Sequence, residues 1–218
     1  MARKFKKSKV SICVFCEGES EQAYIDFLKS EFHDVAVFKR PSSPGLFDDA
    51  DNRFKKDPRY RNYVDAIDEI WFFFDVEEKD IDNWTNRLEI IKRLRKLRKD
   101  PKIRVRLLMT TGCIEYWLML HYRHLAPSLL TVPDKERMLA QVVNMEPTYR
   151  KGNYDATARI AQNYPTAVKN ATIVLQNLLQ EGMPGLEDTD ERNRWLCTKC
   201  KTFSTVQEAI VFLEGLQS

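Results

Sequence analysis

The stretch over residues 10–21 constrains the fold of this chain more than any other. Residues 10–16 are a run of β-branched, aromatic and other apolar side chains, which predicts a buried strand. The run stops abruptly at Glu17, and Gly18 permits a sharp turn of the backbone. Residues 19–28 then show helical spacing of apolar side chains, with acids in the first turn, where negative charge is favourable. The stretch therefore predicts a strand, an acid, a turn and a helix, with the acid at the sheet edge where open α/β folds bind ligands.

Further buried-strand patterns follow along the chain. Residues 69–74 and 103–109 are apolar runs of strand length, and residues 35–38 form a shorter one. Helical spacing of apolar residues lies between the two long runs, over residues 84–99. Strands that alternate with helices predict βαβ units with right-handed crossovers. The fold class that we expect is α/β, with a mainly parallel, Rossmann-like sheet flanked by helices.

The character of the sequence changes after residue 126. Three segments predict helices beyond this point, at residues 133–144, 156–179 (with a break at Pro165) and 204–216. We therefore expect a basic tail over residues 1–9, an α/β domain over residues 10–126, and a mainly helical extension over residues 127–218 packed on that domain.

Acidic residues end two of the predicted strands. Asp75 ends the second long run as Glu17 ends the first, and the period of two along an extended backbone puts Asp75 and Glu77 on the same side. If the two strands are neighbours, the three carboxylates face one another and repel. A hard divalent cation, Mg²⁺ or Mn²⁺, would relieve that repulsion and support in-line phosphoryl displacement. The alternative is that each acid forms a turn or caps a helix, as acids at strand ends often do. The pattern alone leaves both interpretations open.

Positive charge is concentrated in two runs, although the net charge is only +3. Residues 1–9 hold five Lys or Arg and no acid, and residues 87–106 hold ten Lys or Arg against two acids. Such runs suit a polyanion-binding surface, and a solvated helix face with a charged tail is an equal alternative. The candidate nucleic-acid contacts are Arg93, Lys96, Lys99 and Lys151.

Two further features bear on location and metal binding. No apolar run approaches the length of about 20 residues that a membrane span needs. The five cysteines, an odd number, fit reduced thiols, so we expect a cytoplasmic protein with no membrane partner. Cys197 and Cys200 form half of a zinc site, with no obvious second half in the sequence.

An ordered set of short motifs resembles a known family. Glu17-Gly18-x-x-Glu21 after the first strand, with Asp75-x-Glu77 after a later one, resembles the Toprim domain of topoisomerases, primases and OLD-type nucleases. The fuller set is similar to the RloB family and spans most of the chain; it comprises residues 16–24, 74–77, 113–122 and 149–151, with Ala167 and Ala171 in the helix that follows.

The resemblance implies a Toprim-like sheet and a role in antiphage defence, often beside an ATPase of the ABC or AAA type encoded nearby. It implies acid/base work for Glu17 and metal binding for Asp75 and Glu77. The second acid of the pair is Glu77, where the Toprim pattern usually has Asp, and Asp80 is a further potential ligand nearby. Glu115 matches a family glutamate before an aromatic-rich helix, and it could complete the metal site or cap that helix.

From these observations we expect a Mg²⁺- or Mn²⁺-dependent nuclease of Toprim type that cleaves RNA such as tRNA, or DNA, in antiphage defence. The alternative is a non-catalytic adaptor or sensor subunit of an ATPase-containing complex, and a homodimer is left open. The candidate catalytic residues are Glu17, Glu21 and Glu115, and the candidate metal ligands are Asp75, Glu77 and Asp80.

Overall fold

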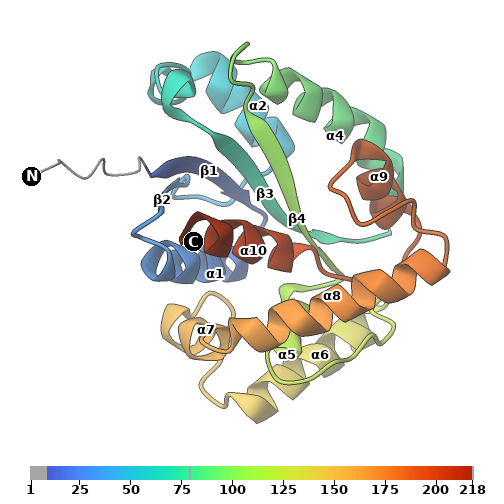
Figure 1. The fold of residues 1–218 in the computed structure, drawn as a ribbon. Coiled ribbons are helices and arrows are strands. Elements are labelled where there is room, and N and C mark those ends of the chain that lie inside the picture. The colour runs from blue at the N-terminus through green and yellow to red at the C-terminus, as the bar shows by residue number, and fades with distance from the viewer. Residues whose placement is uncertain (1–8, 79, 218) are drawn as a thin grey trace, which may run out of the picture.

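A computed structural model describes residues 9–78 and 80–217 and shows one parallel sheet between layers of helices (Figure 1). Four strands make up the sheet in the order β2-β1-β3-β4, and every neighbouring pair is parallel. The strands are β1 (Val10–Cys16), β2 (Ala36–Lys39), β3 (Glu69–Val76) and β4 (Arg104–Thr111). This arrangement confirms the predicted α/β, Rossmann-like fold. The predicted basic tail lies outside the described residues, apart from Lys9.

The helices in the described part of the chain connect the strands and then continue beyond them. Those associated with the sheet crossovers are α1 (Glu19–Glu31), α2 (Phe47–Lys56), α3 (Pro58–Arg61), a 3-10 turn over Val64–Ala66, and α4 (Asp80–Arg95). After β4 come α5 (Ile114–Leu120), α6 (Val132–Met145), α7 (Tyr154–Ala161), α8 (Tyr164–Gln180), α9 (Asp190–Thr198) and α10 (Val206–Gln217). The sequence pattern did not predict α9, and it extended α4 four residues too far.

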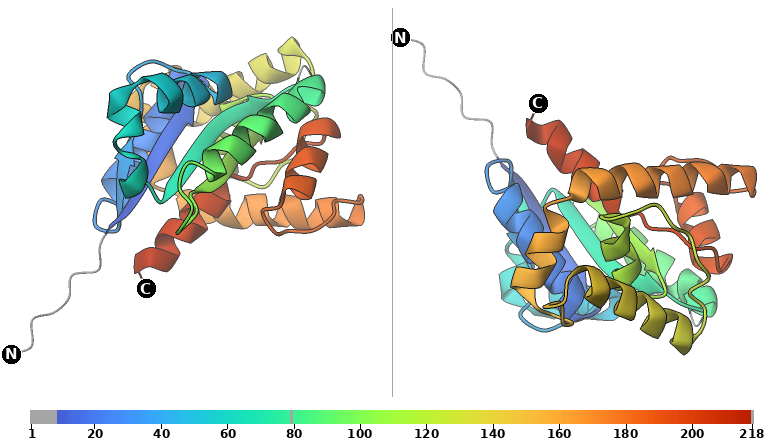
Figure 2. Two further views of the ribbon diagram at one scale, coloured as in Figure 1. Left: turned by 90° about the horizontal axis from the view of Figure 1, so that it is seen from above. Right: turned by 90° about the horizontal axis from the view of Figure 1, so that it is seen from below.

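The central strand β3 is buried on both faces because helices cover both sides of the sheet (Figure 2). Trp71 and Phe73 point into one core, and Phe72 and Phe74 point into the other. This explains why the segment is a continuous apolar run, since an alternating pattern needs one solvated face. The first core is filled by α1, α5, α6, α7 and α10, and the second by α2, α3, α4 and α9. The long helix α8 contributes to both.

The segment before α10 covers the outer edge of β4. Thr205 N–H donates to the Met109 carbonyl at 2.9 Å, and Thr111 N–H donates to the Phe203 carbonyl at 3.0 Å. The hydroxyl of Thr205 also accepts from Met109 N–H and donates to the Leu107 carbonyl, each at 2.8 Å. An exposed strand edge would offer unpaired backbone groups to other chains. The C-terminal part of the chain therefore completes the sheet as well as packing on it.

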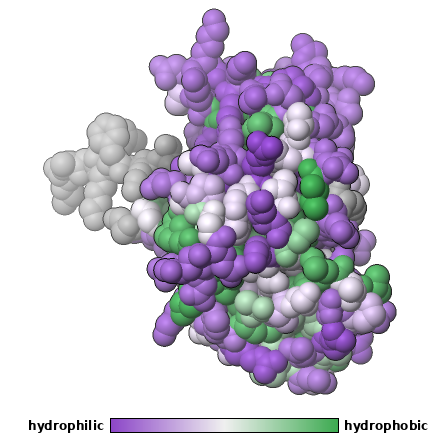
Figure 3. All heavy atoms as spheres, turned by 90° about the vertical axis from the view of Figure 1, so that its right-hand side faces the viewer, coloured by the Kyte–Doolittle hydropathy of each residue, from purple (hydrophilic) through white to green (hydrophobic). Residues whose placement is uncertain are grey.

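The surface seen in Figure 3 is mostly hydrophilic, with small separate apolar patches. Among the described residues, no helix is both long and apolar enough to cross a membrane.

Candidate active site

The ends of β1 and β3 bring Glu17 and Asp75 together at the carboxyl edge of the sheet. Cys16 pairs with Phe73, and the backbone N–H of Glu17 continues the ladder by donating to the Phe73 carbonyl at 3.0 Å. The Glu17 carboxylate then accepts a hydrogen bond from the backbone N–H of Asp75 at 3.0 Å. The two acids predicted from separate strand ends therefore meet, as parallel neighbours require.

The turn into α1 adds a third acid, Glu21, to this edge. Glu21 is only 4% exposed although it is charged at neutral pH in ordinary surroundings. Its carboxylate folds back against the turn, so closely that a Cβ atom added at Gly18 would lie 2.8 Å from Glu21 Oε2. The pKa of Glu21 is raised to about 7, chiefly by burial. The charges of Glu17 and Glu115 contribute to the rise, and backbone hydrogen bonds oppose it.

The start of α5 supplies a fourth acid, Glu115. Gly112 makes the turn after β4 with φ of +76°, in a conformation that glycine adopts without strain. This turn sets Glu115 in the first turn of α5, where its side chain is 1% exposed. The hydroxyl of Tyr149 donates to Glu115 Oε1 at 3.1 Å, and Lys151 Nζ lies 3.9 Å from the same oxygen. Glu115 is thus held by two side chains from a distant loop.

Asp75 lies at the centre of these charges. Burial raises the pKa of Asp75 well above its ordinary value, and the carboxylates of Glu21, Glu17 and Glu115 add to the effect in that order. Its Oδ1 atom is buried and has no hydrogen-bond partner among the described residues. A buried oxygen of this kind is costly unless a donor or a cation satisfies it. The four acids and Lys151 line a pocket of about 290 Å³.

The loop that carries Lys151 is fixed against the start of α1. The backbone N–H of Gly152 donates to Ser20 Oγ at 3.1 Å, and Gly152 has φ of +75°. A Cβ atom at Gly152 would lie 3.1 Å from the side chain of Glu19, so the loop packs closely against that side chain. Sequence reasoning did not assign Tyr149, Ser20 or Gly152 to the site. The signal that could have found them is the Tyr-Arg-Lys-Gly motif before α7.

The structure places the predicted metal ligands Glu77 and Asp80 outside this pocket. Strand β3 ends at Val76, so the alternation that would have aligned Glu77 with Asp75 stops one residue early. Glu77 forms an ion pair with Lys135 and lines a separate pocket. Asp80 is buried, accepts from the backbone N–H of Glu77 at 2.8 Å, and pairs with Arg87 at 2.5 Å. Both carboxylates therefore have structural contacts, although Glu77 is close enough to raise the pKa of Asp75 slightly.

The basic residues of the second charged run do not line the acidic pocket. The chain after α4 reaches the amino edge of the sheet, where Arg98 donates to the carbonyls of Asp65 and Pro101. Arg93 pairs with Asp51 on α2 at 2.9 Å, while Lys96 and Lys99 are exposed. Several charges of this run are paired with acids; these pairs are Arg87–Asp80, Lys92–Glu89, Arg95–Asp190, Arg104–Asp188 and Arg106–Glu69. Of the four predicted nucleic-acid contacts, the fold brings only Lys151 to the pocket.

The side chains of this pocket have the chemistry that a divalent cation needs, but they are not arranged around a cation position. Within residues 9–78 and 80–217, no three or more His, Cys, Asp or Glu side chains are arranged as a metal-binding group. The donor set is nevertheless all carboxylate, which hard cations prefer. The buried, unpartnered Oδ1 of Asp75 is an oxygen that such a cation would satisfy. Asp75, Glu21 and Glu115 are the residues that would hold it.

Comparison with known proteins identifies the family. The family model described as RloB-like protein matches residues 12–210. The chain belongs to the RloB-like family. The match begins within β1 and ends in the first half of α10, so it includes every acid of the pocket and Lys151. A search of curated proteins and a search of solved structures each gave no match.

Proposed function

We propose that this RloB-like chain is a divalent-cation-dependent phosphodiesterase that cleaves nucleic acid. The observation that carries the proposal is the convergence of these four carboxylates on a single pocket at the carboxyl edge of the sheet, which Glu19 and Lys151 also line. Four carboxylates held this close repel one another and destabilise the fold unless their charge is neutralised. Carboxyl groups with shifted pKa values in a cleft are typical of functional sites. The unpartnered Oδ1 of Asp75 supports a cation as the missing partner.

The four acids divide by their exposure. Asp75, Glu21 and Glu115 carry buried carboxylate oxygens, which suits them to hold a cation away from solvent. Glu17 is exposed at the mouth of the pocket and is fixed by the Asp75 backbone, so it can exchange a proton with water. We assign Glu17 to general acid/base work on the attacking water or the leaving oxygen. A bound Mg²⁺ or Mn²⁺ would neutralise phosphate charge and polarise the phosphoryl group.

Lys151 provides the positive charge on the substrate side. Its side chain is 65% exposed, and its ammonium group lies beside Glu115. A lysine at the rim can bind a phosphate oxygen of the substrate next to the scissile group. Family membership supports a defence role, and the substrate that fits that role is tRNA or other RNA, or DNA.

A cleavage assay tests the proposal. The purified chain is incubated with tRNA, single-stranded DNA and duplex DNA, in Mg²⁺, in Mn²⁺ and in chelator. Cleavage that requires the cation and falls at least about a hundredfold in Asp75→Asn and Glu115→Gln is the expected result. Glu136→Gln is the matched control, because Glu136 is an exposed acid on α6 outside the pocket.

Two results would overturn the proposal. One is cation-dependent cleavage that survives both pocket substitutions, since the activity would then come from elsewhere. The other is the absence of both cleavage and cation binding in calorimetry, with and without an ABC- or AAA-type ATPase partner. That second result would favour a non-catalytic adaptor whose acids are structural.

A further inference from the structure

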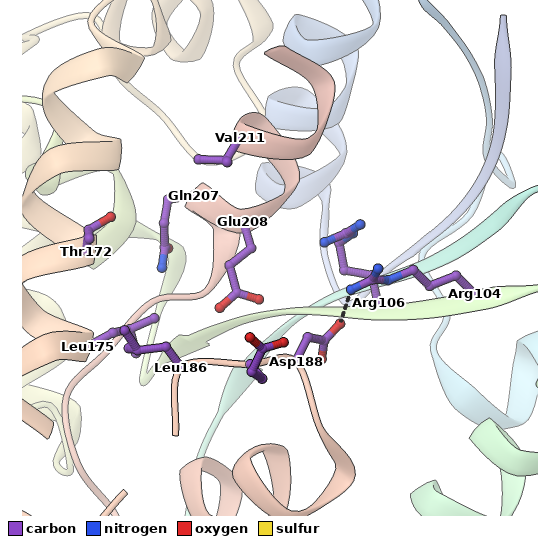
Figure 4. A pocket seen from close by; sticks show the side chains of 10 residues that line it. Arg104, Arg106, Thr172, Leu175, Leu186, Asp188, Gln207, Glu208 and Val211 are labelled. Atoms are coloured by element: carbon purple, nitrogen blue, oxygen red, sulfur yellow. Dashed lines mark hydrogen bonds and ion pairs between the residues drawn. The ribbon is translucent and has the colours of Figure 1, made fainter. Parts of the chain in front are cut away.

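A second pocket lies against the amino-terminal half of β4, away from the acidic pocket. It has a volume of about 350 Å³ and is bounded by β4, α8, α10 and the loop before α9 (Figure 4). Its polar residues Arg104 and Arg106 lie at the start of β4, where Arg104 is in register with Glu69 of β3. Asp75 is six residues further along β3, which corresponds to about 20 Å. The two pockets are therefore separate.

Gln207 gives this pocket an unsatisfied polar group. Its side chain is on α10, is only 3% exposed, and extends into the cavity in Figure 4. The buried Oε1 atom has no hydrogen-bond partner among the described residues. An unsatisfied buried amide oxygen destabilises the fold, and a ligand with an N–H donor would remove this cost. The first requirement of the site is therefore an N–H group on the ligand.

Glu208 lies beside Gln207 and strengthens the same requirement. Arg192 donates to Glu208 Oε1 at 2.5 Å and to Oε2 at 3.0 Å from behind the pocket. Each carboxylate oxygen can accept a second hydrogen bond. Burial raises the pKa of Glu208, so a further donor would stabilise its ionised form. Gln207 and Glu208 of α10 thus both offer hydrogen-bond acceptors to this pocket.

The opposite side of the pocket carries positive charge. Arg104 has a side chain that is 54% exposed, and its nearest acid, Asp188, is 3.4 Å away. In Figure 4, Arg104 lies across the cavity from Gln207 and Thr172. Asp188 is 10% exposed, but the separation is long and the guanidinium itself is exposed, so it can turn to an anion at the mouth. The second requirement is therefore an anionic group at the other end of the ligand.

Three apolar side chains line the pocket, beside the charged Arg106 and Glu187. Leu175 from α8, Leu186 from the loop and Val211 from α10 line the cavity. Leu186 is 43% exposed and Val211 is 53% exposed, so the apolar surface is open to a ligand. Such surfaces pack against the face of a planar ring. The volume falls in the range of about 300–1,000 Å³ that is typical of small-molecule sites.

We propose that this pocket binds a nucleotide whose base carries an amino group. The amino group donates to Gln207 and Glu208, the base packs between Leu175, Leu186 and Val211, and the phosphate reaches Arg104. The proposal does not depend on the phosphodiesterase function. A nucleotide bound here would contact β4 and α10, and not the acidic pocket.

Two matched pairs of nucleotides test the proposal by calorimetry with the full chain. Cytidine and uridine monophosphates differ mainly in an amino group against a carbonyl oxygen, and adenosine and inosine monophosphates differ in the same way. We expect the amino member of at least one pair to bind about tenfold more tightly than its partner. Gln207→Leu should remove that discrimination. Arg104→Gln should weaken the monophosphate about tenfold and leave the corresponding nucleoside unchanged.

Two further variants check that the nucleotide binds in this pocket. Val211→Trp fills the exposed mouth without a buried polar change, so it should abolish binding even if Gln207→Leu folds poorly. Asp75→Asn should leave nucleotide affinity unchanged, because the acidic pocket is distant. The proposal is overturned if all four monophosphates fail to bind, if both pairs bind without discrimination, or if Val211→Trp has no effect. Binding of agmatine in place of any nucleotide would also overturn it, since that result assigns the pocket to a guanidinium group.

Discussion

The Glu17 carboxylate accepts a hydrogen bond from the backbone N–H of Asp75 at 3.0 Å, although 58 positions separate them in the sequence. This contact fixes Glu17 on the same edge of the sheet as Asp75. The two helices that begin at this edge then add Glu21 and Glu115. A nuclease site built on these strand ends requires this arrangement, and an arrangement with the two acids on opposite edges would have excluded it.

The stability of the protein should depend on the protonation of Glu21. The pKa of Glu21 is about 7 in the fold against 4.5 in ordinary surroundings, so the folded state holds the proton more tightly than the unfolded state. The contribution of Glu21 to stability is therefore fully present below about pH 4.5 and is lost as the pH rises through about 7, with a total loss of about 3 kcal/mol. Glu21→Gln removes this loss. Thermal unfolding should show a variant that is more stable than the native protein at about pH 8 and close to it at about pH 5.

Glu136→Gln is the control for that comparison, because Glu136 is exposed. If Glu136→Gln were stabilised at high pH as much as Glu21→Gln, the pH dependence of stability would not come from Glu21. Mg²⁺ added at about pH 8 should stabilise the native protein more than Glu21→Gln, since the cation and the substitution relieve the same repulsion.

Tyr149 should stabilise the fold through Glu115. Its hydroxyl is buried and donates to the Glu115 carboxylate at 3.1 Å. Tyr149→Phe leaves a buried charge with one donor fewer and should lower the free energy of unfolding by about 2 kcal/mol. Denaturant titration measures this loss. Tyr154→Phe is the matched control, since Tyr154 is 41% exposed, and equal losses in the two variants would argue against the contact.

Substitutions of Lys151 and Lys96 should show whether the substrate binds at the acidic pocket or along the basic run. Lys151 lies at the rim of the pocket, and Lys96 lies near the opposite edge of the sheet. Lys151→Gln should lower the cleavage rate about tenfold or more without weakening cation binding, because a phosphate contact is lost. Lys96→Gln should leave the rate unchanged. A larger effect of Lys96→Gln would place the substrate beside the C-terminal end of α4 instead.

Thr205 should anchor the C-terminal segment to β4. Its hydroxyl bridges the Met109 N–H and the Leu107 carbonyl in the interior. Thr205→Val removes both bonds while keeping the shape of the side chain, so it should cost about 3 kcal/mol of stability. Thr198→Val loses only bonds to its own helix, at the carbonyls of Arg194 and Trp195, and should change stability by less than about 0.5 kcal/mol. Similar values for the two variants would show that the edge does not depend on Thr205.

The sequence predicted those parts of the site that follow from local pattern and one topological rule. Glu17 and Asp75 each end an apolar run, and parallel neighbouring strands bring such ends together. Glu77 shows where the pattern fails, since its position depends on whether β3 ends at residue 76 or 77. A shift of one residue reverses the direction of a side chain. Such a shift is decided by packing, and not by the residues themselves.

The contacts made by the loop at residues 149–152 could not be predicted in this way. Tyr149 is 34 positions from Glu115, and its place depends on how α6 and α7 pack against α1 and α5. The direction of α4 likewise carries Lys96 away from the pocket, although the same basic run suggested a substrate surface in the sequence. Charge patterns identify side chains that could bind a polyanion, but tertiary packing decides which of them lie beside the acids.

Anomalous scattering from a crystal soaked in Mn²⁺ would show whether the acidic pocket binds a cation. We expect a peak within coordination distance of Asp75 Oδ1, with Glu21 or Glu115 completing the ligand set. A peak beside Glu77 and Asp80 instead, or no peak at the end of β3 with Mn²⁺ in excess, would contradict this expectation.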